Sequence, residues 1–171
     1  MPQVKISLRQ GEMLQAGTVG LLRRIMSVDK LNDQMHSPDA NPWQIDIEGA
    51  MAELAFAKAT GMFWSAGINT FKAPDVGRVQ IRSTPKKDNS LIIRSNDKDD
   101  DVFVLVIGSA PDYTIAGWIR GREGKDPQWV RSPNGGASAY FVPQSHLRPI
   151  QELREVGHGT ASQEPEQQAA A

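Results

Sequence analysis

Two segments in the first third of the chain carry apolar residues at the spacing of a helix. Over about Gly11–Leu31, apolar side chains recur every three or four positions, which predicts an amphipathic helix. Two glycines, Gly17 and Gly20, weaken this prediction or divide the helix in two. The solvated face of the helix would carry the basic residues Arg23, Arg24 and Lys30.

The second helical segment, about Ile47–Ala59, is apolar on nearly every side. Such a helix is usually buried, and Gly61 is a plausible end for it. Glu53 lies in the middle of this segment. Because a buried carboxylate is costly unless a partner compensates it, Glu53 stands out from the apolar residues around it.

Short runs of alternating apolar and polar residues predict several strands. They lie at about Val4–Leu8, Ile68–Lys72, Arg78–Ser83, Leu91–Ser95, Val102–Ile107 and Tyr113–Arg120. The connections between the later strands are short and polar, which favours an antiparallel meander. The expected fold is an α/β (mixed α+β) domain over residues 1–155, with a central mixed, largely antiparallel sheet of about five strands flanked by helices.

The remaining segments are predicted to be mostly irregular. Asn32–Gln44 is rich in turn-forming residues and reads as a loop. The chain after Gly121 is irregular until a short helix at about Ser145–Glu155. The tail, residues 156–171, is poor in bulky apolar residues and is expected to be disordered.

The composition of the chain excludes several classes of function. The chain has 171 residues, a formal net charge of −1 and no cysteine. Disulfides, thiolate zinc sites and a cysteine nucleophile are excluded, and the charge does not favour a dedicated DNA-binding module. No apolar run reaches the roughly 20 residues of a membrane span, and the N-terminus lacks the apolar core of a signal peptide. A cytoplasmic protein is expected.

The segment after the buried helix holds the polar residues with most chemical interest. Asp75 lies in the sequence PDVG, and Gln80 and Arg82 share one face of the strand that follows, since side chains alternate along a strand. Taken separately, these features describe a tight turn and a half-exposed strand. The acidic run Asp97–Asp101 likewise reads as a solvated hairpin loop.

Taken in order, Glu53 on a helix, Asp75 near a strand start and Gln80-Ile81-Arg82 on that strand resemble the PD-(D/E)XK nuclease superfamily. The likeness is closer to its small restriction-endonuclease-like members from phages and mobile elements. The resemblance implies a magnesium or manganese ion held by Glu53, Asp75, Gln80 and the Ile81 carbonyl, and hydrolysis of DNA phosphodiester bonds. It also implies that Arg82 stabilises the developing negative charge. If a phage encodes the chain, the location is the host cytoplasm.

This chain departs from the superfamily pattern at two positions. Gln80 replaces an acidic ligand, and Arg82 replaces a lysine. A neutral amide should bind a cation less strongly, and an arginine keeps its proton and cannot serve as a general base. The alternative is therefore a catalytically inactive protein of the same fold that binds DNA or a protein partner.

DNA is the expected partner under the nuclease reading, and a homodimer remains open. The candidate contacts to nucleic acid are Lys86, Lys87, Arg122, Lys125, Trp129 and Arg131. Trp129 is the best candidate for stacking on a base, although tryptophans are more often buried in a core. Solvated loop positions are the ordinary explanation for the lysines.

Overall fold

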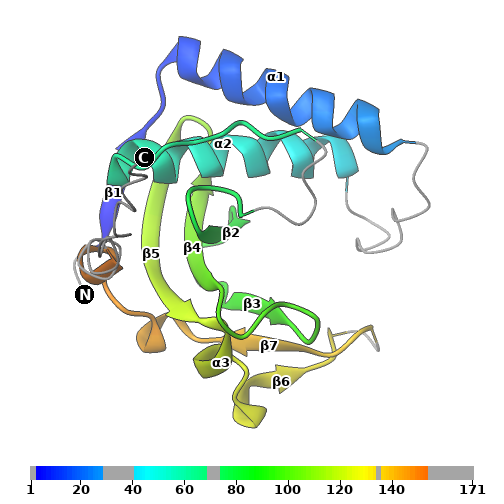
Figure 1. The fold of residues 1–171 in the computed structure, drawn as a ribbon, viewed down its shortest axis with the longest axis vertical. Helices are drawn as coiled ribbons and strands as arrows, with labels where there is room; N and C mark the ends of the chain where they lie inside the picture. Colours follow the sequence, from blue (N-terminus) through cyan, green and yellow to red (C-terminus); the bar gives the residue numbers. More distant parts are fainter. Residues whose placement is uncertain (1–2, 29–40, 69–73, 134–135, 154–171) are drawn as a thin grey trace, which may run out of the picture.

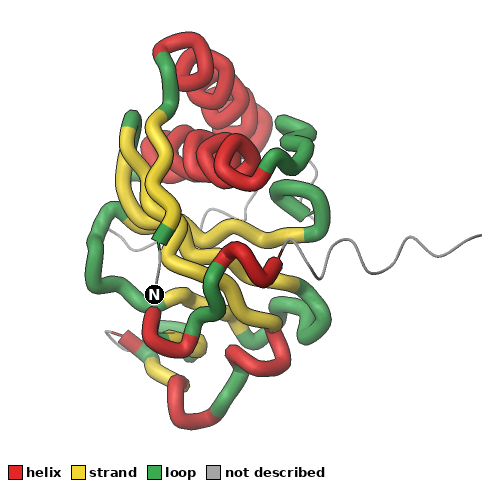
Figure 2. Tube along the Cα trace, turned by 90° about the vertical axis from the view of Figure 1, so that its left-hand side faces the viewer, coloured by secondary structure: helices red, strands yellow, loops and turns green. Residues whose placement is uncertain are grey.

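Two N-terminal helices pack on a four-strand mixed sheet, and a three-strand antiparallel sheet packs on its other side (Figure 1). These elements come from a computed structural model, which describes residues 3–28, 41–68, 74–133 and 136–153. Figure 2 shows the helix pair and the smaller sheet on opposite sides of the larger sheet. The expected mixture of helices and strands is confirmed at this level.

The first helix, α1, runs without a break over Gln10–Ser27 and lies along the outer side of α2, Pro42–Thr60 (Figure 1). The prediction that glycines divide α1 is wrong. A Cβ atom at Gly20 would lie 2.5 Å from the Asp46 carbonyl oxygen and 2.5 Å from the Ile47 Cα. The two helices therefore approach closely at Gly20, which only a residue without a side chain permits.

The second helix begins five residues before the predicted start. The Asn41 side chain accepts a hydrogen bond from the Trp43 backbone N–H at 3.1 Å, and Pro42 occupies the first turn. The loop predicted over Asn32–Gln44 is thus wrong at its end, while residues 32–40 lie outside the described residues. Gly61 ends the helix with a left-handed φ of 73°, as predicted.

The strands form two sheets and not one antiparallel meander. The larger sheet has the order β1-β5-β4-β2, and the smaller has the order β3-β7-β6. Their bounds are β1 Val4–Ser7, β2 Val79–Thr84, β3 Leu91–Arg94, β4 Val102–Ser109, β5 Asp112–Arg120, β6 Val130–Arg131 and β7 Ala139–Val142. Strand β2 pairs with β4 in parallel, and β3 leaves the larger sheet to pair with β7. The prediction of a meander fails at both places.

The sequence of β4 explains this arrangement, because its two faces contribute to two different cores. Val104 and Val106 pack in the core that includes α2, whereas Phe103, Leu105 and Ile107 pack in the core of the smaller sheet. An apolar strand that is buried on both faces needs cover on both sides. Strand β3 supplies that cover with Leu91 and Ile93, which are fully buried.

The last part of the described chain is more regular than predicted. After β5, the chain forms the short helix α3 (Gly121–Gly124), a 3₁₀ turn at Pro127–Trp129, and then β6 and β7. The helix predicted at Ser145–Glu155 is wrong over its first half. A 3₁₀ turn spans Gln144–His146 and Arg148 pairs with Trp118 through two backbone hydrogen bonds, so helical structure begins only at residue 150.

Two predictions fall on residues that the structure does not describe. They are nearly all of the strand Ile68–Lys72 and the tail, residues 156–171. Among the described residues, no helix combines the length and apolar character needed to cross a membrane.

Candidate functional site

Glu53 is held by two donors from other segments of the chain. Its carboxylate is buried, with 5% of the residue exposed. Arg23 of α1 donates to both oxygens, from Nη1 to Oε1 at 2.6 Å and from Nη2 to Oε2 at 2.8 Å. The Trp64 indole Nε1 donates to Oε2 at 2.8 Å. The cost of burying Glu53 is thus offset by a bidentate ion pair and a third hydrogen bond.

Arg23 links three segments at this point. Besides the two bonds to Glu53, its Nε donates to the Gly67 carbonyl oxygen at 2.8 Å. The guanidinium therefore joins α1, α2 and the segment that follows α2. Its planar set of donors suits this position, since a lysine ammonium could not bridge both carboxylate oxygens in the same way.

The charged side chains of α1 all face α2. Within Gln10–Ser27 they are Glu12, Arg23 and Arg24. Glu12 pairs with Lys58 at 2.7 Å, Arg23 pairs with Glu53, and Arg24 lies 3.8 Å from Asp46. The prediction of a solvated basic face is wrong for Arg23 and Arg24, while Lys30 lies outside the described residues. The buried carboxylate on α2 decides the orientation, because it requires a cation from the neighbouring helix.

The opposite face of α1 is exposed and apolar. Its large exposed side chains, with Val28 directly after the helix, are Leu14, Leu21, Leu22, Ile25, Met26 and Val28. The exposed fraction reaches 73% at Leu14 and is 41% at Leu21. Leu14, Leu21, Ile25 and Val28 are seven, four and three residues apart and fall on one face of the helix as a stripe, with Leu22 and Met26 along its edge. The exposed Thr18 lies between Leu14 and Leu21 on this face. Helix α1 therefore turns its ions inward and its apolar stripe outward.

Asp75 lies within electrostatic range of this ion pair. Its Oδ2 accepts a hydrogen bond from the Ile81 backbone N–H at 2.6 Å, which joins the turn to β2. Burial, together with the negative charge of Glu53, raises the pKa of Asp75 to about 6. The Ile81 N–H and the charges of Arg82 and Arg23 oppose this rise. Glu53 and Asp75, paired in the prediction, are thus within electrostatic range of each other.

The strand residues Gln80 and Arg82 project to the other side of the larger sheet. Val79 and Ile81 pack in the core that includes α2, so their neighbours along β2 point toward the smaller sheet. Arg82 lies 5.1 Å from the centre of the Phe103 ring, which belongs to the second core. The structure brings Glu53 and Asp75 together and directs the Gln80 and Arg82 side chains to the opposite face.

Arg82 is engaged by the acidic loop after β3. Its Nη2 donates to the two carboxylate oxygens of Asp97 at 3.0 and 2.9 Å, and its Nε donates to the Ile92 carbonyl oxygen at 3.3 Å. Asp97 also accepts from the Arg94 backbone N–H at 2.8 Å. At least this member of the acidic run is therefore a structural anchor and not a solvated loop residue.

The arrangement of oxygens does not fit a divalent cation. A magnesium site needs several free oxygen ligands, preferably charged ones. Both Glu53 oxygens accept from Arg23 and Trp64, and Gln80 lies on the other face of β2. The part of the chain that the structure describes contains no group of three or more acidic or histidine side chains that could hold a metal ion. The positive charge beside Glu53 comes from Arg23.

No protein-family model, curated protein or solved structure matches the chain.

Three residues that contact the candidate site were not singled out by the sequence for this role. Arg23 was placed on a solvated face, Trp64 was one of four tryptophans, and Asp97 was one of a run of acidic residues. The buried Glu53 was the available signal, because it requires a cation from elsewhere in the chain. Which cation would meet it depends on how α1 packs, and the sequence pattern does not specify this.

The predicted contacts to nucleic acid are divided between paired and exposed residues. Lys125 binds Asp99 at 2.7 Å, and Arg122 pairs with Asp100. Trp129 belongs to the second core, is only 9% exposed and has its ring edge-on to the exposed His146, so the ring is not presented to a base. Lys86, Lys87 and Arg131 are exposed, and so is Arg122 although it is paired.

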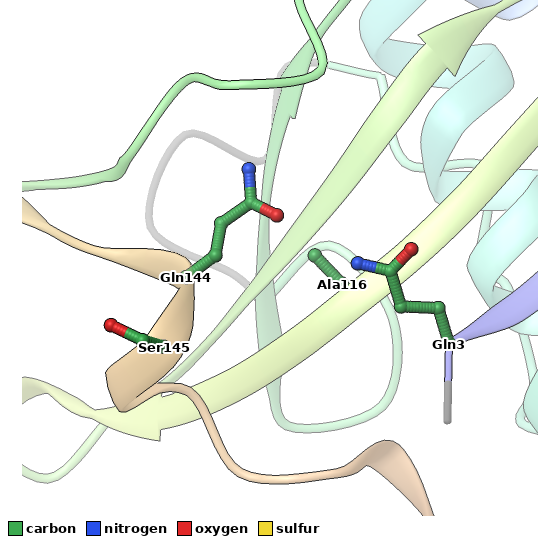
Figure 3. Close-up of a pocket in the computed structure, with 4 residues that line it drawn as sticks. All are labelled: Gln3, Ala116, Gln144 and Ser145. Carbon is green, nitrogen blue, oxygen red and sulfur yellow. The ribbon is translucent and has the colours of Figure 1, made fainter. Parts of the chain in front are cut away.

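An open hollow of about 330 Å³ lies away from the carboxylates (Figure 3). It is lined by Gln3, Ala116, Gln144 and Ser145, with the two glutamines on either side of Ala116. Ala116 packs toward the second core, on the side of the larger sheet that faces away from Glu53. The Gln144 amide already donates to the carbonyls of Lys87 and Asn89. None of the described residues that line this hollow is ionisable, and the Ser145 hydroxyl lies 3.2 Å from Nδ1 of the exposed His146.

Proposed function

We propose that this chain is a restriction-endonuclease-like protein that acts by binding a protein partner and does not hydrolyse phosphodiester bonds through a metal ion. The observation that carries the proposal is the orientation of α1. Its three charged side chains pair with residues of α2, and its apolar stripe faces outward. This one arrangement closes the carboxylate site and exposes an interaction surface.

The inward face of α1 argues against metal-dependent hydrolysis. A metal mechanism of the PD-(D/E)XK type requires Glu53 as a ligand, and Arg23 occupies both of its oxygens. Separating a buried ion pair and leaving one charge without a partner costs about 3–5 kcal/mol. A metal ion would have to overcome that cost and the Trp64 hydrogen bond as well. Arg82 is similarly engaged, by Asp97.

The outward face of α1 argues for a protein partner. Every exposed residue of the helix between Gln10 and Ser27 is uncharged. Soluble proteins seldom leave a contiguous apolar surface of more than a few hundred Å² without using it for binding. A nucleic acid is a poor partner for an uncharged surface, since phosphate contacts dominate its affinity. Lys125, one of the predicted phosphate contacts, already donates to the Asp99 carboxylate and to the backbone carbonyls of Ser95 and Asp97.

A cleavage assay tests the proposal directly. The purified chain is incubated with supercoiled and linear DNA in magnesium and, separately, in manganese, beside Asp75→Asn. We expect no cleavage above the Asp75→Asn background in either metal. Metal-dependent cleavage by the wild type that disappears in Asp75→Asn would overturn the proposal. Asp75→Asn is a suitable control because its amide oxygen can still accept from the Ile81 N–H.

The second candidate function is the metal-dependent DNA nuclease, and one observation favours it. Asp75 is a carboxyl group with a raised pKa beside a second carboxylate, and such groups are enriched at functional sites. This candidate requires Glu53 to separate from Arg23. A saturable increase in melting temperature with magnesium, absent in Asp75→Asn, would support it. The first proposal expects the same melting temperature with and without magnesium.

A further inference from the structure

The strongest unexplained feature of the surface is the apolar stripe of α1. It consists of Leu14, Leu21, Leu22, Ile25, Met26 and Val28, with Trp43 and Ile45 exposed at the start of α2. Gly20, where α2 approaches α1, is buried and lies on the opposite face of α1, so the stripe itself faces away from α2.

We propose that the α1 stripe is the interface of a homodimer, in which α1 of one chain packs against α1 of a second copy about a twofold axis. The inference rests on the proposed function and names its partner. In a twofold contact the same patch meets itself, so each residue near the axis lies close to its own copy. A charged patch would repel itself in that geometry, whereas the exposed residues of α1 are all uncharged.

The size of the surface fits this partner. The six exposed side chains of the stripe present apolar area on the order of 500 Å², against about 800 Å² that each partner contributes to a standard interface. The polar rim of a contact would supply the remainder. Depletion of charged residues is typical of the centre of an interface.

Other segments of this chain are poor candidates to cover the stripe. Residues 154–171 contain one large aliphatic residue, Val156, and residues 29–40 contain only Leu31 and Met35. Residues 1–2 and 69–73 contain Met1 and Phe71. None of these sequences can match six large apolar side chains. A second copy of α1 can, because it presents the same six.

Leu21 lies midway between Leu14 and Val28, at the centre of the stripe, and is the position to test. The mass of the full chain in solution is measured by sedimentation from nanomolar to high micromolar concentration. We expect the wild type to pass from one chain to two, and Leu21→Glu and Leu21→Lys each to weaken the dimer by at least about 100-fold, because like charges would meet. Mixing the two variants should restore a dimer that contains one chain of each.

The matched control is Val130→Glu, which changes an exposed apolar residue on β6 and should leave the dimer intact. Circular dichroism verifies the fold of each variant, and Ile25→Glu provides a second charged position on the stripe. A wild type that stays monomeric at every concentration would overturn the inference, and so would a dimer that Leu21→Glu does not weaken. Failure of Leu21→Glu and Leu21→Lys to pair when mixed would exclude a twofold contact at this position.

These results are separable from the proposed function. A chain that cleaves DNA with magnesium and dimerises through α1 would refute the proposed function and support the dimer. An inert chain that remains monomeric would do the reverse.

Discussion

The guanidinium of Arg23 on α1 binds both carboxylate oxygens of Glu53 on α2, at 2.6 and 2.8 Å. This pair orients α1, because its partner carboxylate is buried and would be costly if left alone. With Arg23 turned inward, the residues on the opposite face of the helix are turned to solvent. The closure of the carboxylate site and the exposed apolar stripe are thus two consequences of one ion pair.

We expect Arg23→Ala to lower the free energy of unfolding by about 3 kcal/mol, since it leaves a buried carboxylate without its cation. The double variant Arg23→Met with Glu53→Gln removes both charges and should recover at least half of the loss. Urea unfolding of the three proteins provides the comparison. Equal losses in the single and double variants would show that Arg23 acts through packing and not through the ion pair.

We expect Asp75→Asn to stabilise the fold in a manner that depends on pH. The pKa of Asp75 is raised to about 6 from 3.8, so its contribution to stability is complete below pH 3.8 and is lost as the pH rises through 6. Asparagine has no proton to lose. The gain in unfolding free energy of Asp75→Asn over the wild type should therefore be near zero below pH 3.8 and reach about 3 kcal/mol above pH 6.

Unfolding free energies of the wild type and Asp75→Asn at several pH values check this prediction. A stability gain of Asp75→Asn that is the same at every pH would contradict the raised pKa of Asp75. A stability gain that grows as the pH falls would mean that this pKa is lowered and not raised. Since the amide can keep the hydrogen bond from the Ile81 N–H, loss of that bond would not explain either result.

We expect Gly20→Ala to destabilise the protein although alanine is the better helix former. The added Cβ would lie 2.5 Å from backbone atoms of α2, so the helices must separate. Overpacking of this kind costs about 1–3 kcal/mol. The control is Gly49→Ala on α2, where the Cβ meets nothing within 4 Å, and which should stabilise by about 0.5–1 kcal/mol. Thermal unfolding measures both, and equal signs would refute the contact at Gly20.

We expect a measurable energetic coupling between Arg82 and Asp97. Their side chains are 25% and 17% exposed and bonded through both carboxylate oxygens, so a double-mutant cycle to alanine should give roughly 1 kcal/mol. The exposed pair Arg122 and Asp100, 59% and 82% exposed, should give about 0.5 kcal/mol or less. Coupling no larger in the first pair than in the second would argue that Arg82 is free for another role.

Much of the local structure follows from short-range pattern. The apolar composition of the Ile47–Ala59 segment predicted a buried helix, and alternation predicted the strands that became β2, β3, β4 and β5. The turn at Asp75 and the end of α2 at Gly61 follow from glycine and aspartate chemistry. These features depend on a few residues that are neighbours in the chain, so they can be predicted from the sequence.

The sequence by itself thus determined the mixture of helices and strands, the burial of α2 and the presence of one carboxylate, Glu53, in the middle of that apolar helix. Tertiary structure decided which face of α1 points inward, because a helical period defines two faces without saying which one meets a partner. It also decided that β2 pairs in parallel with β4 and that Arg82 meets Asp97, since these contacts join residues far apart in the chain. The physical reason is the same in each case: a buried charge or a strand apolar on both faces requires compensation, and only the folded chain determines what supplies it.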